Sequence, residues 1–233
     1  MLQLKALLFD VDGTLADTED AHRIAFNTAF AEFGHDWHWD RDLYTRLLAV
    51  TGGQARIRFF LEGAGMEMLD NETVADMHKC KTKHYVTALQ EGRVPLRPGV
   101  EELISDAREE GLILAIATTT TPVNVQTLLE NTLGAESLDW FKVIGAGDCV
   151  DNLKPAPDVY LWVLDRLQLA AGECLALEDS ANGLKAATAA NVQTVVTSCP
   201  YTAHHDFAGA LAVFDKFDGK VNVDSLKKLH NTL

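Results

Sequence analysis

Leu7-Leu-Phe-Asp-Val-Asp-Gly-Thr-Leu-Ala-Asp-Thr-Glu19 (LLFDVDGTLADTE) joins a short apolar run to two carboxylates, Asp10 and Asp12, and a glycine. The apolar half predicts a buried strand, which places both carboxylates where that strand ends. Buried like charges at this spacing repel each other unless a cation or a shared proton compensates them. The stretch therefore predicts a metal ion, a reaction that uses carboxylates, or both.

Strand-like apolar runs alternate with helix-like segments over most of the chain. The expected strands are residues 4–9, 112–117, 142–145, 174–177, 194–197 and 212–214. The expected helices are residues 100–110, 123–133, 158–167 and 181–190. Strands that are apolar on both faces and alternate with helices indicate a parallel sheet covered on both sides. We therefore expect an α/β fold whose core is a Rossmann-like, doubly wound parallel sheet.

One region breaks the alternation, because residues 17–95 carry helical patterns and no convincing strand. The helices expected there are residues 20–33, 41–48, 54–62 and 71–90. Proline and glycine in residues 92–99 (GRVPLRPG) are typical of a linker. The sequence thus predicts an inserted α-helical cap domain, residues 17–95, and an α/β core domain formed by residues 1–16 and 96–233.

Composition limits the classes of partner and compartment. The formal net charge of −14 disfavours nucleic acids and anionic membranes, which attract basic patches. No apolar run approaches the ~20 residues that a membrane span needs, and the early carboxylates leave no room for a signal-peptide core. The four cysteines lack the C-x-x-C spacing, which favours reduced, buried thiols. We expect a cytoplasmic monomer that binds a small molecule.

Polar residues that end neighbouring strands of such a sheet should converge, because ligands of open α/β sheets bind beyond the carboxyl ends of the strands. The residues expected to meet there are Asp10, Asp12, Thr118, Lys154, Glu178 and Asp179. Several carboxylates, a hydroxyl and an ammonium at one edge describe a magnesium-assisted site for phosphoryl transfer. Mg²⁺ would bind through Asp10, the carbonyl of Asp12 and Asp179, with Glu178 as a further ligand.

Each residue type has a chemical task in such a site. Asp10 is the expected nucleophile, since a carboxylate that attacks phosphorus gives an aspartyl-phosphate and divides one displacement into two. Asp12 can protonate the leaving oxygen and then take a proton from water. Thr118 and Lys154 would hold the phosphoryl oxygens as negative charge develops.

Simpler interpretations exist for single residues. An Asp-x-Asp-Gly run could be a calcium loop, but the EF-hand pattern needs a glutamate at the twelfth position, which here is Ala21. Glu178 and Asp179 could be acidic residues at a helix N-terminus that Ser180 caps. Lys154, taken alone, would be a surface lysine. The ordered series of motifs favours the functional interpretation over each of these.

These motifs together resemble the haloacid dehalogenase superfamily over essentially the whole chain. Its four motifs correspond to Asp10–Thr14, Thr118, Lys154 and Glu178–Ser180. The resemblance implies a hydrolase with a helical cap of the kind that phosphoglycolate phosphatases and β-phosphoglucomutases share. True dehalogenases of the superfamily lack the second aspartate, so Asp12 favours phosphate chemistry.

Within that superfamily, the cap resembles the CbbY proteins, Calvin-cycle-associated phosphatases that remove the 1-phosphate of xylulose 1,5-bisphosphate. The similar stretches are Glu19–Asn27, Asp36–Asp40, Thr51–Gly53 with Arg56, and Ala115–Thr120. The resemblance implies Glu19 and His22 near the transferring phosphate, and Gly52, Gly53, Arg56 and Lys81 at the distal phosphate or sugar, with Arg97 helping from the linker. The implied substrate-binding residues from the core are Thr118, Thr120 and Lys154.

The resulting hypothesis is a Mg²⁺-dependent phosphatase of small sugar phosphates, with xylulose 1,5-bisphosphate as the leading substrate. One departure bears on the second phosphate, because Gln54 follows the paired glycines where the resemblance leads us to expect a lysine. The alternatives are a phosphomutase of the β-phosphoglucomutase kind and another small-substrate phosphatase such as phosphoglycolate phosphatase. A non-enzymatic binding protein is disfavoured because all four motifs are complete.

Overall fold

The computed structural model describes residues 3–217 and 219–232. The chain divides into two compact units, which we call the core unit (Met1–Asp17 with Pro95–Leu233) and the cap unit (Thr18–Val94). Each unit is described by itself below. No helix within the described ranges is long and apolar enough to cross a membrane.

The core unit is built on a six-stranded sheet in the order β3-β2-β1-β4-β5-β6, and every neighbouring pair is parallel. The strands are β1 (Ala6–Phe9), β2 (Ile113–Ala117), β3 (Phe141–Gly145), β4 (Cys174–Glu178), β5 (Gln193–Thr197) and β6 (Ala212–Phe214). The chain adds β2 and β3 on one side of β1 and then β4 to β6 on the other. This reversal confirms the predicted doubly wound parallel sheet.

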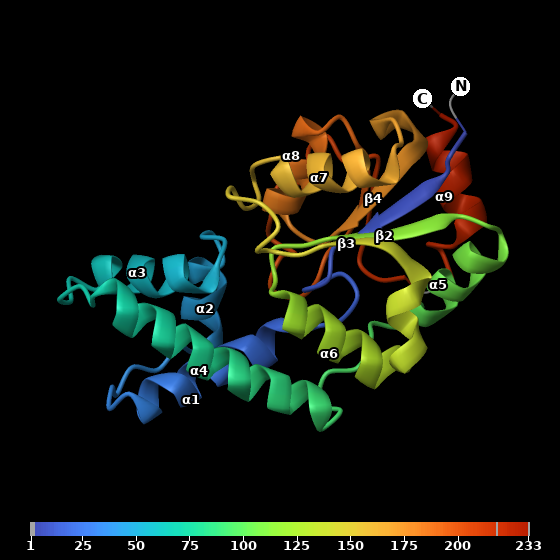
Figure 1. Cartoon of the computed structure of the whole chain (residues 1–233). Coiled ribbons are helices and arrows are strands. Elements are labelled where there is room, and N and C mark those ends of the chain that lie inside the picture. Colours follow the sequence, from blue (N-terminus) through green and yellow to red (C-terminus); the bar gives the residue numbers. More distant parts are fainter. Residues whose placement is uncertain (1–2, 218, 233) are drawn as a thin grey trace. The chain divides into compact units, whose positions relative to one another are not determined.

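Helices cover both faces of this sheet, as the apolar strands require. They are α5 (Val100–Glu109), α6 (Pro122–Leu133), α7 (Asp158–Leu167), α8 (Ala181–Ala189) and α9 (Val223–His230). Figure 1 shows α7 and α8 on one side of the sheet and α5 and α6 on the other. Beneath α7 and α8, Val163 and Ala187 pack with Leu8 and Ala115 of the strands in one buried cluster.

Three short elements of the core unit have no counterpart in the sequence prediction. They are α9 and two turns of 3-10 helix, Ala135–Trp140 and Ala171–Glu173. The α9 helix begins where the Asn222 side chain accepts a hydrogen bond from the Ser225 backbone N–H, 2.9 Å away.

The cap unit contains four helices and no strand over residues 18–94, all of which the structure describes. The helices are α1 (Glu19–Glu32), α2 (Arg41–Leu47), α3 (Gly53–Gly63) and α4 (Asn71–Gln90). Trp39 is fully buried, and its ring centroid lies 4.7 Å from those of both Phe26 and Phe30. The Asn27 side chain pairs with the Trp39 backbone through two hydrogen bonds of 2.8 and 2.9 Å. Trp39 thus serves packing in the cap.

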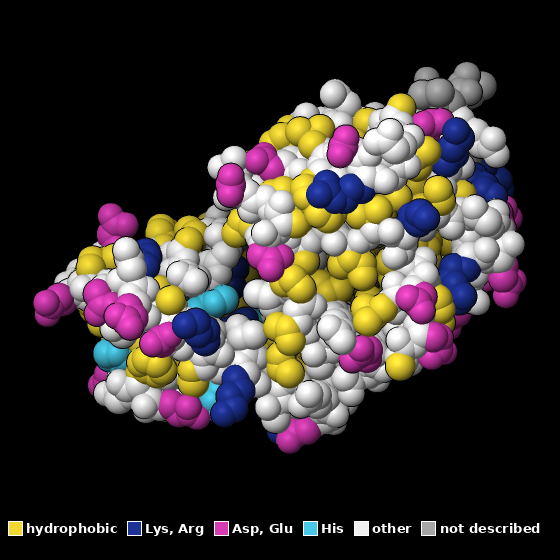
Figure 2. All heavy atoms as spheres, in the orientation of Figure 1, with side chains coloured by type: hydrophobic (Ala, Val, Ile, Leu, Met, Phe, Trp, Pro, Cys, Tyr) yellow, Lys and Arg dark blue, Asp and Glu magenta, His cyan; other side chains and the backbone are white. Residues whose placement is uncertain are grey.

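The charged side chains and the four cysteines are distributed as follows. On the face shown in Figure 2, acidic and basic side chains are interspersed. All four cysteines are free, but only Cys174 and Cys199 are buried; Cys80 and Cys149 are half-buried. The expectation of buried thiols therefore holds for two of the four.

Candidate active site

The register of the central strands brings the motif residues of the core unit to one edge. Phe9, the last residue of β1, is in register with Leu177 of β4. The residues that follow them, Asp10 and Glu178, therefore lie level at the carboxyl ends of neighbouring strands. Because the strand order reverses between β1 and β4, this edge is where an open α/β sheet binds its ligand.

Three buried carboxylates meet at this edge. Asp10, Glu178 and Asp179 each offer an oxygen within 4.8 Å of the others, and all three side chains belong to buried residues. Oxygen donors of this kind are the ligands that Mg²⁺ prefers in proteins. The Lys154 ammonium contacts two of them, Asp10 and Glu178, so the group carries more negative than positive charge when ionised. Donor type and charge both fit a divalent cation.

Lys154 is a buried residue that ties three strands together. Its Nζ donates to Asp10 Oδ1 at 2.7 Å, to Glu178 Oε1 at 2.6 Å and to the carbonyl of Ala117, at the end of β2, at 2.8 Å. Burial alone would lower the pKa of Lys154, but the charges of Asp10 and Glu178 outweigh burial and raise that pKa. The side chain therefore stays an ammonium, and the interpretation as a surface lysine is wrong.

Burial also changes the pKa of Asp10, and for this acid it raises the pKa. Loss of solvent raises the pKa of this carboxyl above its ordinary value, Lys154 opposes the shift, and the negative charges of Glu178 and Asp12 add to it. Further positive charge beside Asp10 would favour its ionised form. Asp12 itself is half-buried in the loop after β1.

Asp179 is held by residues that follow β5 and by the loop after β1. Its Oδ2 accepts hydrogen bonds from the Thr202 hydroxyl at 3.2 Å and from the Cys199 thiol at 3.3 Å. Gly13 has φ of +78°, and a Cβ at this position would lie 2.2 Å from Asp179 Oδ2. Only glycine allows the loop to pass this close to the carboxylate.

Glu178 is held in place by two residues, Tyr160 and Gly183, that do not belong to the sequence motifs. Tyr160, buried on α7, donates its hydroxyl to Glu178 Oε1 at 2.6 Å. A Cβ at Gly183 on α8 would lie 1.9 Å from Glu178 Oε2, so glycine leaves the space that this oxygen occupies. A glycine inside a helix is a sequence signal for such a close approach. Nothing in the sequence distinguishes the Tyr160 hydroxyl from other core aromatics.

The threonines after β2 differ in their contacts. Thr118 is buried directly beyond the strand, and its hydroxyl accepts from the Thr120 backbone N–H at 3.3 Å. The Thr120 hydroxyl accepts from the Asn124 side chain at 2.9 Å. Phe9 is in register with Ile116 of β2, so Asp10 lies beside Ala117, and Thr118 is the next residue along the chain. The Thr120 hydroxyl, by contrast, is already hydrogen-bonded to Asn124 at the start of α6.

Arg97 differs from its expected role in holding a phosphate. Its buried guanidinium donates to the carbonyls of Thr197 at 2.7 Å, Ser198 at 2.8 Å and Asp215 at 3.2 Å, and also to the carbonyl of Gly13. A guanidinium has five N–H donors, and main-chain oxygens of the core unit take several of them. Arg97 therefore supports the backbone of the core.

In the cap unit, the structure brings His22 and Lys81 together across α1 and α4. Both residues are buried, and Lys81 Nζ lies 2.7 Å from His22 Nδ1. The His22 ring stacks on Tyr85, with centroids 3.8 Å apart, and the Lys81 ammonium lies 5.0 Å from the centroid of the Phe26 ring. The Lys81 charge is thus held in an aromatic setting.

Arg56 and Glu19 meet through a shared tyrosine in the same unit. Arg56 Nη1 donates to the Tyr44 hydroxyl at 3.0 Å, and that hydroxyl donates to Glu19 Oε2 at 3.0 Å. Arg56 Nε is buried and has no hydrogen-bond partner within the described residues. A buried donor of this kind favours an additional acceptor, such as an anion.

The paired glycines Gly52 and Gly53 lie at the start of α3, the helix that carries Arg56. Gly52 has φ of +93° and precedes α3, and a Cβ at Gly53 would lie 2.3 Å from His78 Nε2. Burial, together with the charges of Lys81, His22 and Arg56, lowers the pKa of His78 to about 4. The His78 ring is therefore neutral at physiological pH.

Comparison with known proteins shows the family of the chain. Residues 7–197 match the family model described as haloacid dehalogenase-like hydrolase. The chain belongs to this family. The protein CbbY of Cupriavidus necator is 53% identical over 216 residues, which cover 90% of this chain and 84% of the relative. This hydrolase is therefore a CbbY-type member of the family and an enzyme, a phosphoric monoester hydrolase.

Solved structures match the hydrolase over nearly its full length. A CbbY variant from Rhodobacter sphaeroides, in complex with xylulose-(1,5)bisphosphate, is 43% identical with a TM-score of 0.90, covering 96% of this chain and 99% of that one. A β-phosphoglucomutase from Clostridium difficile has a TM-score of 0.83 at 22% identity, covering 99% and 98%. The second likeness shows a shared fold alone.

Proposed function

We propose that this hydrolase removes the 1-phosphate of xylulose 1,5-bisphosphate through an aspartyl-phosphate on Asp10. One observation carries the chemistry: three carboxylates and a lysine meet in a buried group at the strand ends, with Asp10 at its centre. The substrate is supported by the CbbY relatives, one of which was solved with that bisphosphate. The activity would give the protein a place beside the Calvin cycle.

In this mechanism, a carboxylate oxygen of Asp10 attacks phosphorus while Asp12 donates a proton to the leaving sugar oxygen. Asp12 then takes a proton from the water that hydrolyses the phosphoenzyme and regenerates Asp10. Lys154, which stays charged, and the Thr118 hydroxyl hold the phosphoryl oxygens, where negative charge develops.

The carboxylates of Asp10 and Asp179 and the carbonyl of Asp12 would hold Mg²⁺. Glu178 would contribute through Oε2, since its Oε1 already accepts from Lys154 and Tyr160. When bound, the ion supplies the positive charge that lets a carboxylate approach an anionic phosphoryl group.

The cap residues would bind the rest of the sugar phosphate. Arg56 and Lys81 are cations on two helices of the cap unit, and Arg56 retains a buried donor without a partner within the described residues. Gly52 and Gly53 offer backbone N–H groups at the start of α3. We propose this set for the distal phosphate, and Glu19 and His22 for the sugar oxygens near the transferred phosphate.

Phosphate release from a panel of substrates tests the proposed function. We expect xylulose 1,5-bisphosphate to react faster than ribulose 1,5-bisphosphate, β-glucose 1-phosphate and phosphoglycolate, and all release to stop in EDTA and return with Mg²⁺. Preference for a monophosphate would overturn the substrate. Isomerised sugar phosphate without free phosphate would establish the phosphomutase instead, and turnover that persists in EDTA would contradict the metal requirement.

Arg56→Ala tests the distal-phosphate role. We expect KM for the bisphosphate to rise about 10- to 100-fold with little change in kcat, because the lost contact is made equally in the ground and transition states. Steady-state kinetics with a monophosphate should change much less. Arg58→Ala, which removes the same charge two residues further along α3, is the matched control. An equal rise in KM for both variants would contradict a specific role for Arg56.

A further inference from the structure

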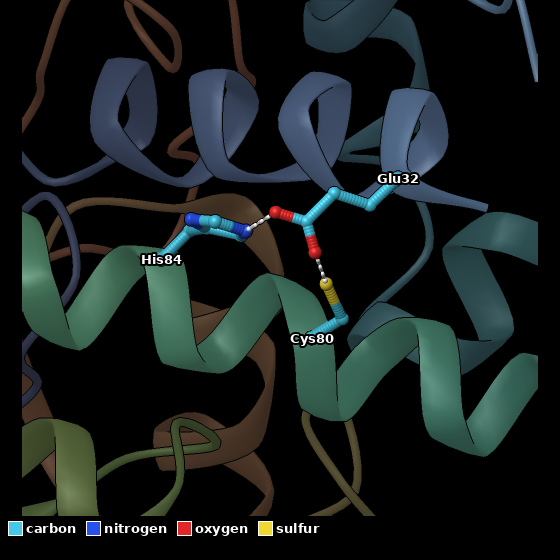
Figure 3. Close-up of side chains that lie close together, drawn as sticks. All are labelled: Glu32, Cys80 and His84. Atoms are coloured by element: carbon cyan, nitrogen blue, oxygen red, sulfur yellow. Dashed lines mark hydrogen bonds and ion pairs between the residues drawn. The ribbon is translucent and has the colours of Figure 1, made fainter. Parts of the chain in front are cut away.

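A second cluster of metal-binding side chains lies in the cap unit, between α1 and α4. Glu32, at the end of α1, reaches between Cys80 and His84 of α4 (Figure 3). The Cys80 thiol donates to Glu32 Oε2 at 3.1 Å, and His84 Nε2 lies 2.7 Å from Glu32 Oε1. The proposed phosphatase mechanism uses none of these three residues.

The positions of these side chains follow from helix geometry. Cys80 and His84 are four residues apart on α4, so they lie on one face of that helix. Glu32 is 48 residues from Cys80 in the chain and comes to the same place because α1 packs along α4. One face of α4 thus presents sulfur and nitrogen donors, and α1 adds a carboxylate oxygen.

The donor atoms are close enough for one metal ion. One atom of each side chain lies within 4.8 Å of the other two. A tetrahedral zinc site, with bonds of about 2.0–2.3 Å, separates its ligand atoms by roughly 3.3–3.8 Å. The donor separations of at most 4.8 Å thus exceed these ligand distances by about 1.0–1.5 Å at most, and the proposal requires the side chains to rotate by enough to close that difference.

We propose that Glu32, Cys80 and His84 bind a Zn²⁺ ion that joins α1 to α4, with water as the fourth ligand. A thiolate and an imidazole select zinc over magnesium and calcium, which prefer oxygen donors. The carboxylate triad of the core unit offers oxygen donors only, so the two sites differ in their metal. Glu32 is exposed and its two partners are half-buried, which leaves the ion a path from solvent.

Zinc binding at this site can be written with protons and charges accounted for. The Cys80 thiol releases its proton to solvent, and its sulfur forms the bond to the ion. His84 binds through Nε2 in its neutral form, and the two hydrogen bonds of Glu32 are replaced by one metal–oxygen bond. Thiolate and carboxylate together neutralise the charge of the ion, so the site needs no further counter-charge.

The bound zinc ion would stabilise the packing of α1 against α4, the two helices that also carry His22 and Lys81. Lys81 is the next residue after Cys80, and His22 lies on α1 with Glu32. An ion that binds the folded cap and not the unfolded chain stabilises the fold by RT ln(1 + c/Kd), where c is the concentration of the free ion, so the melting temperature rises with that concentration. Zinc would therefore act on the stability of the cap, whatever substrate the hydrolase takes.

Cobalt and zinc titrations of the metal-free, full-length protein test this proposal, in excess Mg²⁺ so that the core site is occupied. We expect Co²⁺ to give a sulfur-to-cobalt charge-transfer band and tetrahedral visible bands, and Zn²⁺ to remove both at one equivalent. Replacing a ligand should weaken zinc binding at least about 100-fold, since even residues that only orient a ligand cost about 10–100-fold. Cys80→Ser and His84→Gln are the test variants.

Cys149→Ser is the matched control, because Cys149 is the other half-buried free thiol and lies in the core unit. It should keep the cobalt spectrum and the zinc affinity, as should Asp10→Asn. The absence of a charge-transfer band, or equal zinc affinity of the wild type and Cys80→Ser, would overturn the proposal. Circular dichroism of each variant establishes that it is folded. None of these measurements uses turnover, so failure of this site and failure of the proposed function are distinguishable.

Discussion

Asp10→Asn is expected to lower the rate of phosphate release by on the order of 10⁴-fold or more, because an amide cannot form the phosphoenzyme. The protein should stay folded, since asparagine keeps an oxygen for the hydrogen bond from Lys154. Removing one of the crowded carboxylates should leave the melting temperature in EDTA unchanged or raise it. Loss of activity with retained stability is the result that separates a chemical role from a structural one.

Two further measurements sharpen this expectation. Intact mass after a rapid acid quench should detect one added phosphoryl group on the wild type and none on Asp10→Asn. Asp106→Asn, which alters an exposed aspartate on α5, is the control and should keep full activity. Turnover of Asp10→Asn within tenfold of the wild type would contradict covalent catalysis at this residue.

Lys154→Met is expected to reduce the free energy of unfolding in EDTA by about 3–5 kcal/mol, because it leaves buried carboxylates without their cation. Methionine keeps the apolar part of the side chain, but the hydrogen bonds to Asp10, Glu178 and Ala117 are lost. Urea denaturation of both proteins measures the difference. Activity should also be lost, since no ammonium remains to hold the phosphoryl group.

The pH dependence of that difference identifies its cause. Burial already raises the pKa of Asp10, and without the opposing ammonium the pKa of this carboxyl in the folded variant lies further above its unfolded value. The folded form then takes up protons that the unfolded form does not, and the variant gains stability as the pH falls from about 8 to about 6. Lys185→Met, on the exposed side of α8, should show no such effect. A pH-independent loss would indicate that packing, and not charge, is responsible.

The sheet could be predicted because its strands are apolar on both faces. The strand expected at residues 174–177 is β4 (Cys174–Glu178), and the helix expected at residues 71–90 is α4. The helix α9 escaped prediction because it is eight residues long, and only Val223, Leu226 and His230 are buried in it. A pattern that short cannot be distinguished from a polar terminus.

The core of the site was predictable for a different reason, namely that parallel strands end at a common edge. This rule brings Asp10, Glu178 and Asp179 together, as the structure has them. Contacts that depend on how a helix packs on the sheet were not predictable, and the Tyr160 hydroxyl on Glu178 is the example. The chemical roles of all these residues stay predictions until the variants are measured.

Arg97 and the backbone around it bear on how the family can vary. The chain leaves the core unit after Asp17 and returns at Pro95, and Ala16 and Leu96 form an antiparallel bridge at this point. The Arg97 backbone N–H also donates to the Leu15 carbonyl at 2.8 Å. The two ends of the insertion are thus neighbours within the core itself, like the base of a hairpin. An insertion whose two ends are neighbours leaves the core chain closed on itself, so a change in the length or sequence of residues 18–94 does not by itself require the loop after β1 to move.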